Sequence, residues 1–464
     1  MYRLGRSGSR CVVVVDGEHY PPVIEAALAE LEAAGGEVLA AVLAGGTEKL
    51  QDAGIERLGD VPVRSGPDAS EVLAETIEEL APDEVVDLSD EPVLDYRKRH
   101  ELASVSLALG VPYSGADFAF VPPARERRCN RASVAIVATG KRTGKTAVAG
   151  FAARTLTRAG HKPVVVAMGR GGPPEPEILR GDEIVLDVKD LISLADAGRH
   201  AASDYVEDAL LARVPTVGCR RCGGGLAGGV EFSNVARGVE LANELPGDLF
   251  LLEGSGSAIP PVHADSTILV VPAFLPEEYL AGYFGSYRLL LADFAVVTMC
   301  EEPFGSPSQV SAIASRINSS FRSVRGGGAR GDIQVVRTVF RPVPTRSVQG
   351  AGVYVATTAP TLAAEAIRGH LEEEHGCRVV GMSHSLGDRI RLRDELDEVG
   401  KGVDTLLCEI KAAGIDVAAR WAVGRGLEVV FMDNVPVGVD GDDPDVLVTD
   451  AARLAQERFE AAAT

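Results

Sequence analysis

Short apolar runs alternate with segments of helical spacing along most of the chain. In the first part, the apolar runs 11–15, 37–43 and 84–88 are separated by stretches that carry apolar residues at helical spacing. The strands expected further along are 134–138, 163–168, 216–218, 249–253, 267–271 and 295–299. Strands that alternate with helices predict a parallel sheet covered by helices, so we expect an α/β fold.

Two breaks in this pattern divide the chain into three parts. The segment 121–130 is rich in proline and arginine and is typical of a linker, and a second proline-containing stretch ends near 344. We therefore expect an N-terminal Rossmann-like α/β domain at 1–127, a central parallel-sheet domain at 131–345 and a C-terminal α/β region at 349–464. The C-terminal region either extends the central sheet or forms a lid, and the pattern leaves both open.

The amino-acid composition indicates which kinds of partner and location suit the protein. The 464-residue chain has a net charge of −21, which argues against nucleic acid and anionic membranes as partners. No apolar run approaches the roughly 20 residues of a membrane span, and residues 1–10 lack a hydrophobic signal core. Seven cysteines without a regular framework are typical of reduced thiols. We expect a cytoplasmic protein; its oligomeric state is not determined by the sequence, and a homodimer is the assembly that we consider.

The clearest motif is a glycine-containing loop between an expected strand and an expected helix. The apolar run that ends at Ala138 leads into Thr139-Gly140-Lys141-Arg142-Thr143-Gly144-Lys145-Thr146. Backbone N–H groups in such a loop and the positive end of the helix form a cradle for phosphate oxygens, although Thr139 stands where the general pattern has its first glycine. We expect the loop to bind ATP, with Lys145 on the β- and γ-phosphates and the Thr146 hydroxyl on Mg²⁺. Lys145, Lys141 and Arg142 are the candidate catalytic cations.

An acidic residue ends another strand of the buried type. Glu253 closes the apolar run 249–253 and is followed by Gly-Ser-Gly-Ser. Phosphate-loop enzymes use a carboxylate at such a strand end to hold the Mg²⁺ that bridges the phosphates. Its combination with Lys145 and Thr146 favours a metal-binding role. Asp204 is a further candidate metal ligand, although Ser203 or Asp204 also suits the more common role of a helix cap.

Two further glycine-rich segments follow expected strands and carry arginines. Arg170 lies between Gly169 and Gly171, and Arg220 and Arg221 come shortly before Gly223, Gly224 and Gly225. Because ligands bind beyond the carboxyl ends of parallel strands, we expect these loops to converge with the phosphate loop. With Lys141 and Arg142 they supply five cations, more than one nucleotide requires. The planar fork of arginine suits phosphate, so we predict a second, strongly anionic small-molecule substrate at these arginines and glycines.

These residues resemble those of a known family. The motif 139–146, the segment 219–229, the turn at 16–20 and the Glu253-Gly-Ser-Gly segment together resemble cyclic 2,3-diphosphoglycerate synthetase, over nearly the whole chain. The resemblance implies that 2,3-diphosphoglycerate is closed to its cyclic pyrophosphate while ATP is converted to ADP and phosphate. It also implies a central P-loop NTPase domain between the two other α/β parts.

Two alternatives stay open at this point. The phosphate loop and the Glu253 segment are also similar to dethiobiotin synthetase, so another P-loop ligase or kinase is one alternative. A diamino acid substrate, however, requires carboxylates rather than arginines. The other alternative is a regulatory ATPase of the partition type, which usually presents an exposed amphipathic segment to its partner. No such segment is evident in this sequence.

Overall fold

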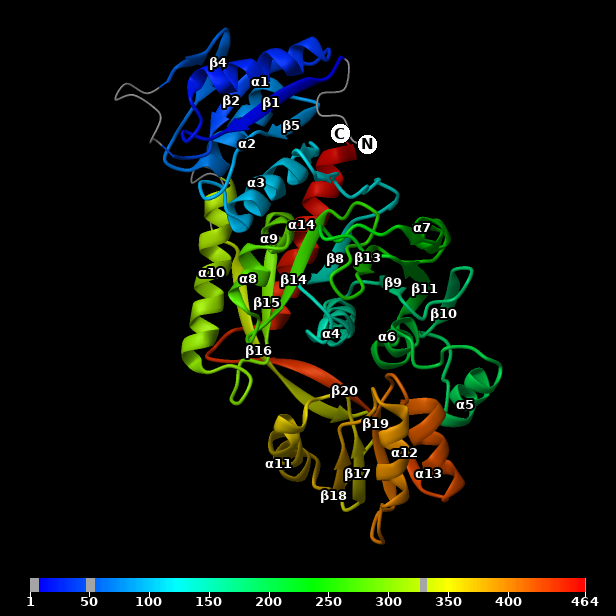
Figure 1. Cartoon of the computed structure of the whole chain (residues 1–464). Coiled ribbons are helices and arrows are strands. Elements are labelled where there is room, and N and C mark those ends of the chain that lie inside the picture. Colours follow the sequence, from blue (N-terminus) through cyan, green and yellow to red (C-terminus); the bar gives the residue numbers. More distant parts are fainter. Residues whose placement is uncertain (1–7, 47–54, 326–331, 464) are drawn as a thin grey trace.

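Three units lie in a row in the computed structural model of the chain, which describes residues 8–46, 55–325 and 332–463 (Figure 1). The N-terminal unit is at one end, the unit with the phosphate loop is in the middle, and a third unit is at the other end. Helix α14 (Pro444–Ala463) runs back from the third unit and packs on the central one. The parallel strands and covering helices confirm the expected α/β fold.

The N-terminal unit is a small, mainly parallel sheet with helices around it. Its strands are β1 (Arg10–Val15), β2 (Glu37–Leu43), β3 (Arg57–Leu58), β4 (Val61–Arg64), β5 (Glu84–Asp87), β6 (Tyr113–Ser114) and β7 (Ala119–Phe120). Its helices are α1 (Pro21–Ala33), α2 (Ala69–Leu80) and α3 (Tyr96–Ala108). The strand order is β3-β4-β2-β1-β5-β6-β7. This unit is joined to the central unit where α3 packs on α9 (Gly285–Leu291), with Ser104 Oγ 2.9 Å from Ser286 Oγ.

The central unit is built on a longer sheet. Its strands are β8 (Ser133–Ala138), β9 (Pro163–Gly169), β10 (Glu177–Arg180), β11 (Pro215–Cys222), β12 (Phe232–Ser233), β13 (Leu249–Glu253), β14 (Ser266–Pro272), β15 (Phe294–Thr298) and β16 (Gln334–Pro344). Its other helices are α4 (Lys145–Arg158), α5 (Val188–Asp196), α6 (Asp204–Ala212), α7 (Val235–Asn243), α8 (Glu277–Ala281) and α10 (Pro307–Arg325). The order β11-β9-β13-β8-β14-β15-β16 is parallel throughout, so the carboxyl ends of these strands share one edge.

The third unit continues the central sheet. Strand β16 pairs antiparallel with β20 (Glu428–Gly438), and the sheet goes on through β19 (Thr405–Glu409), β17 (Gly352–Ala356) and β18 (Arg378–Ser383). The helical segments of this unit are η1 (Thr361–Ala363), α11 (Ala364–His375), α12 (Arg389–Asp397), η2 (Gly414–Ala419) and α13 (Arg420–Gly424). The long strands β16 and β20 therefore connect the two units through one sheet (Figure 1).

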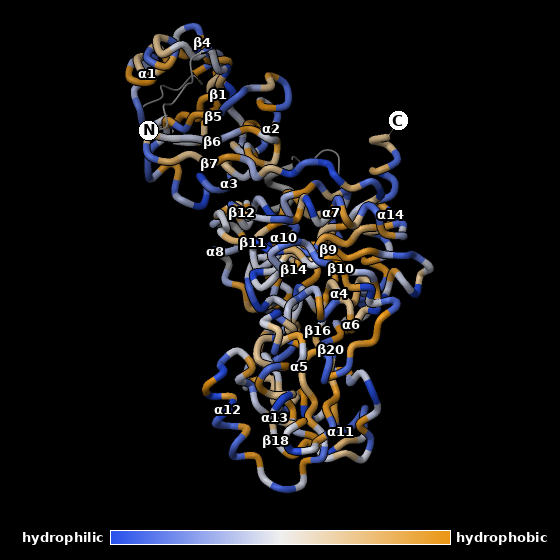
Figure 2. Tube along the Cα trace, turned by 90° about the vertical axis from the view of Figure 1, so that its right-hand side faces the viewer, coloured by the Kyte–Doolittle hydropathy of each residue, from blue (hydrophilic) through white to orange (hydrophobic). Residues whose placement is uncertain are grey.

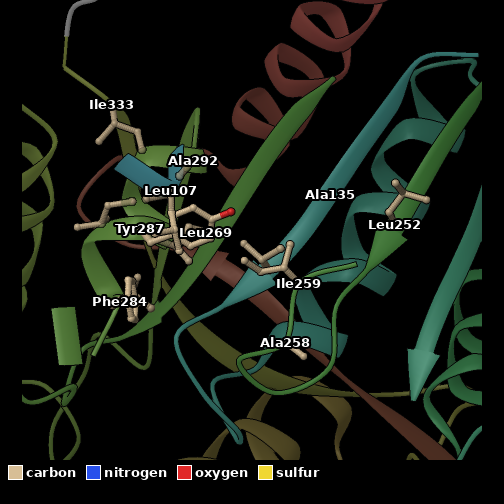
Figure 3. Packing of buried hydrophobic residues seen from close by; sticks show 14 of the residues in the cluster. Leu107, Ala135, Leu252, Ala258, Ile259, Leu269, Phe284, Tyr287, Ala292 and Ile333 are labelled. Carbon is tan, nitrogen blue, oxygen red and sulfur yellow. The ribbon is translucent and has the colours of Figure 1, made fainter. Parts of the chain in front are cut away.

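Buried apolar side chains cover both faces of the central sheet. Along β8, Val134 and Ile136 belong to the cluster beneath α4 and α14, whereas Ala135 and Val137 belong to the cluster on the opposite face. Burial on both faces explains why these strands are continuous apolar runs in the sequence (Figure 2). In the opposite cluster, Tyr287 of α9 lies beside Leu269 of β14 (Figure 3). None of the described helices is long and apolar enough to span a membrane.

Strand β11 runs further than the sequence pattern indicates, and β16 reaches the expected end of the central domain. Strand β11 continues through Cys222 rather than ending at 218, because its last residues pair with β12. Strand β16 continues through Arg341 to Pro344, where the expected central domain closes. Beyond Arg337 this strand has β20 as its strand partner and is no longer paired with β15, so prolines are tolerated there.

Candidate functional site

The phosphate loop lies between β8 and the first turn of α4, as its sequence predicts. Gly144 has a φ of 86° and caps the helix. A Cβ at this position would overlap the Phe340 ring of β16, so only glycine fits both the conformation and the space. The Thr298 hydroxyl at the end of β15 donates to the Thr143 carbonyl oxygen over 2.8 Å. Tertiary contacts therefore hold the loop in place against the sheet.

Two hydroxyls inside this loop are buried without a hydrogen-bond partner. In the described part of the chain, neither Thr139 Oγ1 nor Thr143 Oγ1 makes a hydrogen bond. Buried hydroxyls normally find partners, and an unpaired one carries a desolvation cost of about 1–3 kcal/mol. Phosphate oxygens in the loop would accept hydrogen bonds from such groups. The two hydroxyls without partners are therefore consistent with the nucleotide-phosphate site predicted at 139–146.

Lys145 and Glu253 form a buried ion pair beneath the loop. The exposed fraction is 7 % for the Lys145 side chain and 1 % for that of Glu253, and Lys145 Nζ donates to Glu253 Oε1. Glu253 stands at the end of β13, next to β8. Its second oxygen, Oε2, is buried and has no hydrogen-bond partner among the described residues. The lysine is therefore held at the strand end, and one carboxylate oxygen is free to bind a cation.

Helix α6 adds three carboxylates to this buried region. Burial and then the charge of Glu253 raise the pKa values of Asp204 and Asp208. Burial also raises the pKa of Glu207, while the ammonium of Lys411 opposes that rise from 3.1 Å away. The N-cap Ser203 makes no side-chain capping hydrogen bond, so the cap expected there is not formed by that hydroxyl. Carboxylates thus outnumber cations beside Glu253, and a cation is electrostatically favoured there.

These residues fit a magnesium ion that is shared with phosphate. Among the residues that the structure describes, no three His, Cys, Asp or Glu side chains are placed to hold a metal by themselves. Mg²⁺ in phosphate-transfer sites usually needs only one or two protein ligands, with phosphate oxygens and water completing its octahedron. The free Glu253 Oε2 and the half-buried Thr146, in the first turn of α4, meet that requirement.

The glycine-rich segments lie along the same edge as the phosphate loop. Strands β8, β13, β9 and β11 are consecutive neighbours, and all four are parallel. Arg170 follows β9 directly, and Glu253 ends β13. The phosphate loop, the acidic strand end and the arginine-bearing segments are therefore successive parts of one rim.

Arg170 and Arg221 approach each other above the segment that follows Glu253. Gly256 has a φ of 59°, and a Cβ on it would lie 2.9 Å from Arg170 Nη2 and 3.7 Å from Arg221 Nη2. Arg221 Nη2 donates to the Ser255 carbonyl oxygen over 2.7 Å. Burial, and then the neighbouring Arg170 charge, lower the pKa of Arg221. Neither arginine has a carboxylate partner in the described ranges, so the positive charges of the two are not compensated by an acidic side chain there.

Arg220 is not part of this pair. Because β11 extends through Cys222, successive side chains point to opposite faces of the strand, and Arg220 points away from Arg221. Its backbone N–H donates to Asn234 Oδ1 over 2.7 Å, and its side chain is exposed. Gly223, Gly224 and Gly225 form an exposed turn after the strand. The segment therefore presents its two arginines on different faces instead of in one loop.

The third unit reaches the site from the opposite side. Lys411, two residues beyond β19, pairs with Glu207 of α6, and Arg154 of α4 pairs with Asp433 of β20 at 2.5 Å. Lys141 and Arg142 of the phosphate loop are both exposed, and Arg142 extends toward Gly387, in the loop that precedes α12. The sequence pattern does not indicate a role for Lys411, because a single lysine after a strand carries no local signal of the carboxylates that it meets.

Comparisons with known proteins agree with this arrangement. The chain matches the cyclic 2,3-diphosphoglycerate synthetase N-terminal domain at 10–121, the P-loop domain at 133–325 and the C-terminal domain at 344–435. It is 44 % identical to the cyclic 2,3-diphosphoglycerate synthetase of Rubrobacter xylanophilus over 93 % of this chain and 96 % of that one. It is likewise 44 % identical to the synthetase of Methanothermobacter thermautotrophicus, over 93 % of this chain and 92 % of that one.

Among solved structures, a DUF1611 family protein from Anabaena variabilis covers 82 % of this chain and 95 % of that one, with 14 % identity and a TM-score of 0.20. A match that loose carries no argument. The identities to the synthetases extend over nearly the whole chain, and all three domains of that family are present in order. The chain belongs to the cyclic 2,3-diphosphoglycerate synthetase family.

Proposed function

We propose that this enzyme closes 2,3-diphosphoglycerate to cyclic 2,3-diphosphoglycerate and converts ATP to ADP and phosphate. One observation carries the proposal: the guanidinium groups of Arg170 and Arg221, which have no carboxylate partner among the described residues, lie on the same rim as the phosphate loop. Glu253 ends the strand between that loop and the two arginines. A phosphate loop alone serves any ATP-dependent reaction. A second cationic site beside it suits a substrate that is itself strongly anionic.

The reaction is proposed to proceed in two phosphoryl transfers. The γ-phosphoryl group of ATP passes to one phosphate of the substrate, and ADP leaves. An oxygen of the other substrate phosphate then attacks the inner phosphorus atom of the new pyrophosphoryl group, the one bonded to a glycerate oxygen. The outer phosphate leaves as inorganic phosphate as the ring closes. The nucleophile in each step is an anionic phosphate oxygen, so neither step requires a general base from the protein.

The cations of the rim offset the repulsion between reacting phosphates. Lys145 would leave Glu253 to contact the β- and γ-phosphates, and Lys141 and Arg142 would extend over the loop. Arg170 and Arg221 would hold the substrate phosphates, with the glycines at 223–225, just after β11, as further candidates, whereas Arg220 points to the other face of the strand. Two phosphates held side by side make ring closure effectively unimolecular, which can supply about 7–11 kcal/mol.

Thr146 and Glu253 are the residues that would hold Mg²⁺, with Asp204 as a third candidate. The bound ion would neutralise charge on the phosphate oxygens. Release of Glu253 from Lys145 frees both groups at once, so nucleotide and metal are expected to bind cooperatively.

The alternatives raised by the sequence are less well supported. A ligase like dethiobiotin synthetase would not need the unpaired pair Arg170 and Arg221, and the chain aligns with the diphosphoglycerate synthetases over all three of their domains. A regulatory ATPase would hydrolyse ATP in response to a protein partner. We infer instead a cytoplasmic enzyme with a small anionic substrate, without nucleic acid or membrane as a partner, and we propose a homodimer that sedimentation can test.

The test is ATP turnover with and without 2,3-diphosphoglycerate, followed by phosphorus NMR of the products. We expect substrate-dependent ADP formation and resonances of a cyclic pyrophosphate. ATP hydrolysis that does not depend on 2,3-diphosphoglycerate, with no pyrophosphate product, would contradict the proposal. The Lys145→Ala variant is the control, because it removes the nucleotide contact but leaves the arginine pair in place.

A further inference from the structure

A third arginine contacts the segment that carries Ser255 and Ser257, and it does so from inside the protein. Arg288 of α9 is only 3 % exposed. Its Nε and Nη2 donate to the Ser257 carbonyl oxygen over 3.1 and 2.7 Å, and Nη2 also donates to the Leu226 carbonyl oxygen over 3.2 Å. Nη1 donates to the Phe284 carbonyl oxygen in its own helix over 2.9 Å. One guanidinium group thus ties α9 to two separate loops.

One loop lies beneath the arginine pair, and the other follows the strand that carries Arg221. Ser257 belongs to the turn after Glu253, over which Arg170 and Arg221 meet, and Leu226 belongs to the turn after β11, which carries Arg221. Helix α9 itself is fixed, since Phe284 and Tyr287 are fully buried in the same cluster as Ala258 and Ile259 (Figure 3). Arg288 therefore connects a buried helix to both turns that lie beside the arginine pair.

Its burial is not compensated by a counter-ion. No carboxylate pairs with Arg288 in the described part of the chain, and burial lowers its pKa to about 10. Burying a cation without an acid is unfavourable, and an apolar side chain would pack in such a place at lower cost. What arginine supplies here is a planar fork whose donors are spread over three nitrogens and reach carbonyl oxygens of separate segments, whereas the donors of lysine share one nitrogen and apolar residues have none.

We propose that Arg288 is a positioning residue for the second substrate: it fixes the 254–258 and 223–229 turns so that Arg170 and Arg221 face the phosphates of 2,3-diphosphoglycerate. This inference rests on the proposed function, because it assumes that these two arginines bind that substrate. The distances between the arginines and the substrate phosphates decide how strongly the substrate is bound. A displacement of about 1 Å in a positioned group costs on the order of 100-fold in rate.

The chain offers a matched control at the other edge of the sheet. Arg131, just before β8, is half-buried, and its guanidinium group also donates to backbone carbonyl oxygens. Nη1 donates to those of Leu245 and Gly247 over 3.0 and 2.8 Å, and Nη2 donates to that of Asn243 over 2.9 Å. It lies at the amino-terminal edge, away from the rim. Arg131→Met therefore removes a similar set of bonds without touching the substrate site.

The experiment measures the KM of each substrate and the Kd of 2,3-diphosphoglycerate by calorimetry in Arg288→Met, Arg288→Lys and Arg131→Met. We expect Arg288→Met to raise both constants for 2,3-diphosphoglycerate about tenfold or more while the ATP KM changes less than about twofold. Arg288→Lys should recover only part of the loss, since a point charge cannot bridge two loops. Arg131→Met should lower the Tm but leave both KM values within about twofold of wild type.

Other outcomes would overturn the inference. Equal changes in both KM values, or the same pattern in Arg131→Met, would reduce Arg288 to a stabilising residue, as would failure of both Arg288 variants to fold. Failure of the proposed function appears separately, as wild-type protein that makes no cyclic product. In that case calorimetry with 2,3-diphosphoglycerate still reports whether Arg288 orders an anion site.

Discussion

Lys145 and Glu253 are buried against each other although they lie 108 residues apart along the chain. The cation expected to bind ATP phosphate and the carboxylate expected to bind metal therefore neutralise each other in this pair. Such a pair keeps both groups charged inside the protein, because each compensates the burial of the other. It also implies that removal of one partner changes the behaviour of the other.

Lys145→Ala should abolish turnover and weaken the binding of ATP, because the contact to the β- and γ-phosphates is lost. It also leaves Glu253 buried without its partner, so we expect the Tm to fall as well. ATP binding by calorimetry, steady-state turnover and thermal unfolding measure the three effects. Turnover near the wild-type rate would contradict the phosphate-loop assignment.

Glu253→Gln should raise the Mg²⁺ concentration needed for half-maximal rate and lower the rate by orders of magnitude. The amide keeps the shape of the side chain but loses the charge that attracts the metal and pairs with Lys145. A magnesium titration of turnover at saturating ATP checks the prediction. An unchanged magnesium dependence would assign Glu253 a structural role only.

Arg221→Ala should weaken the binding of 2,3-diphosphoglycerate much more than that of ATP, with a loss of about 2–5 kcal/mol in transition-state stabilisation. Arg221→Lys should restore part of it, since an ammonium lacks the planar fork. Arg220→Ala is the neighbouring control, because its side chain points to the other face of β11. Kinetic constants for both substrates in these variants test the prediction. An effect confined to the ATP constants would place Arg221 in the nucleotide site instead.

Lys411→Met should destabilise the protein by about 3–5 kcal/mol, because it leaves the buried Glu207 without its cation. For Lys411, burial lowers the pKa, but the carboxylates of Glu207 and Glu409 more than offset that effect, so its pKa lies above the usual value. The control is Arg420→Ala, which breaks an exposed pair with Asp196 between the same two units. That change should cost about 0–1 kcal/mol.

Urea unfolding measures both variants of this interface. A further change, Glu207→Gln in the Lys411→Met background, removes the uncompensated charge and should return part of the lost stability. If Lys411→Met is no more harmful than Arg420→Ala, the Lys411 ammonium is not a significant counter-ion of α6.

The sequence by itself determined the elements and the nucleotide loop. Strands such as 37–43 and 249–253 are found at the predicted residues, because burial on both faces of a parallel sheet requires continuous apolar runs. The phosphate loop could be predicted for a similar reason. Its glycines, lysine and threonine are contiguous, so a single stretch of chain carries both the geometry and the chemistry.

Only the tertiary structure decided which distant side chains meet. Arg170 and Arg221 were each identifiable, but their approach over Gly256, and the separation of Arg220 from them, depend on the length of β11. That length is set by pairing with β12, which no local pattern encodes. Arg288 and Lys411 carried no signal at all, because their partners are backbone carbonyls and carboxylates from remote segments. The extension of the sheet through β16 and β20 was open for the same reason: pairing between strands far apart in sequence is decided by packing, not by the residues of either strand alone.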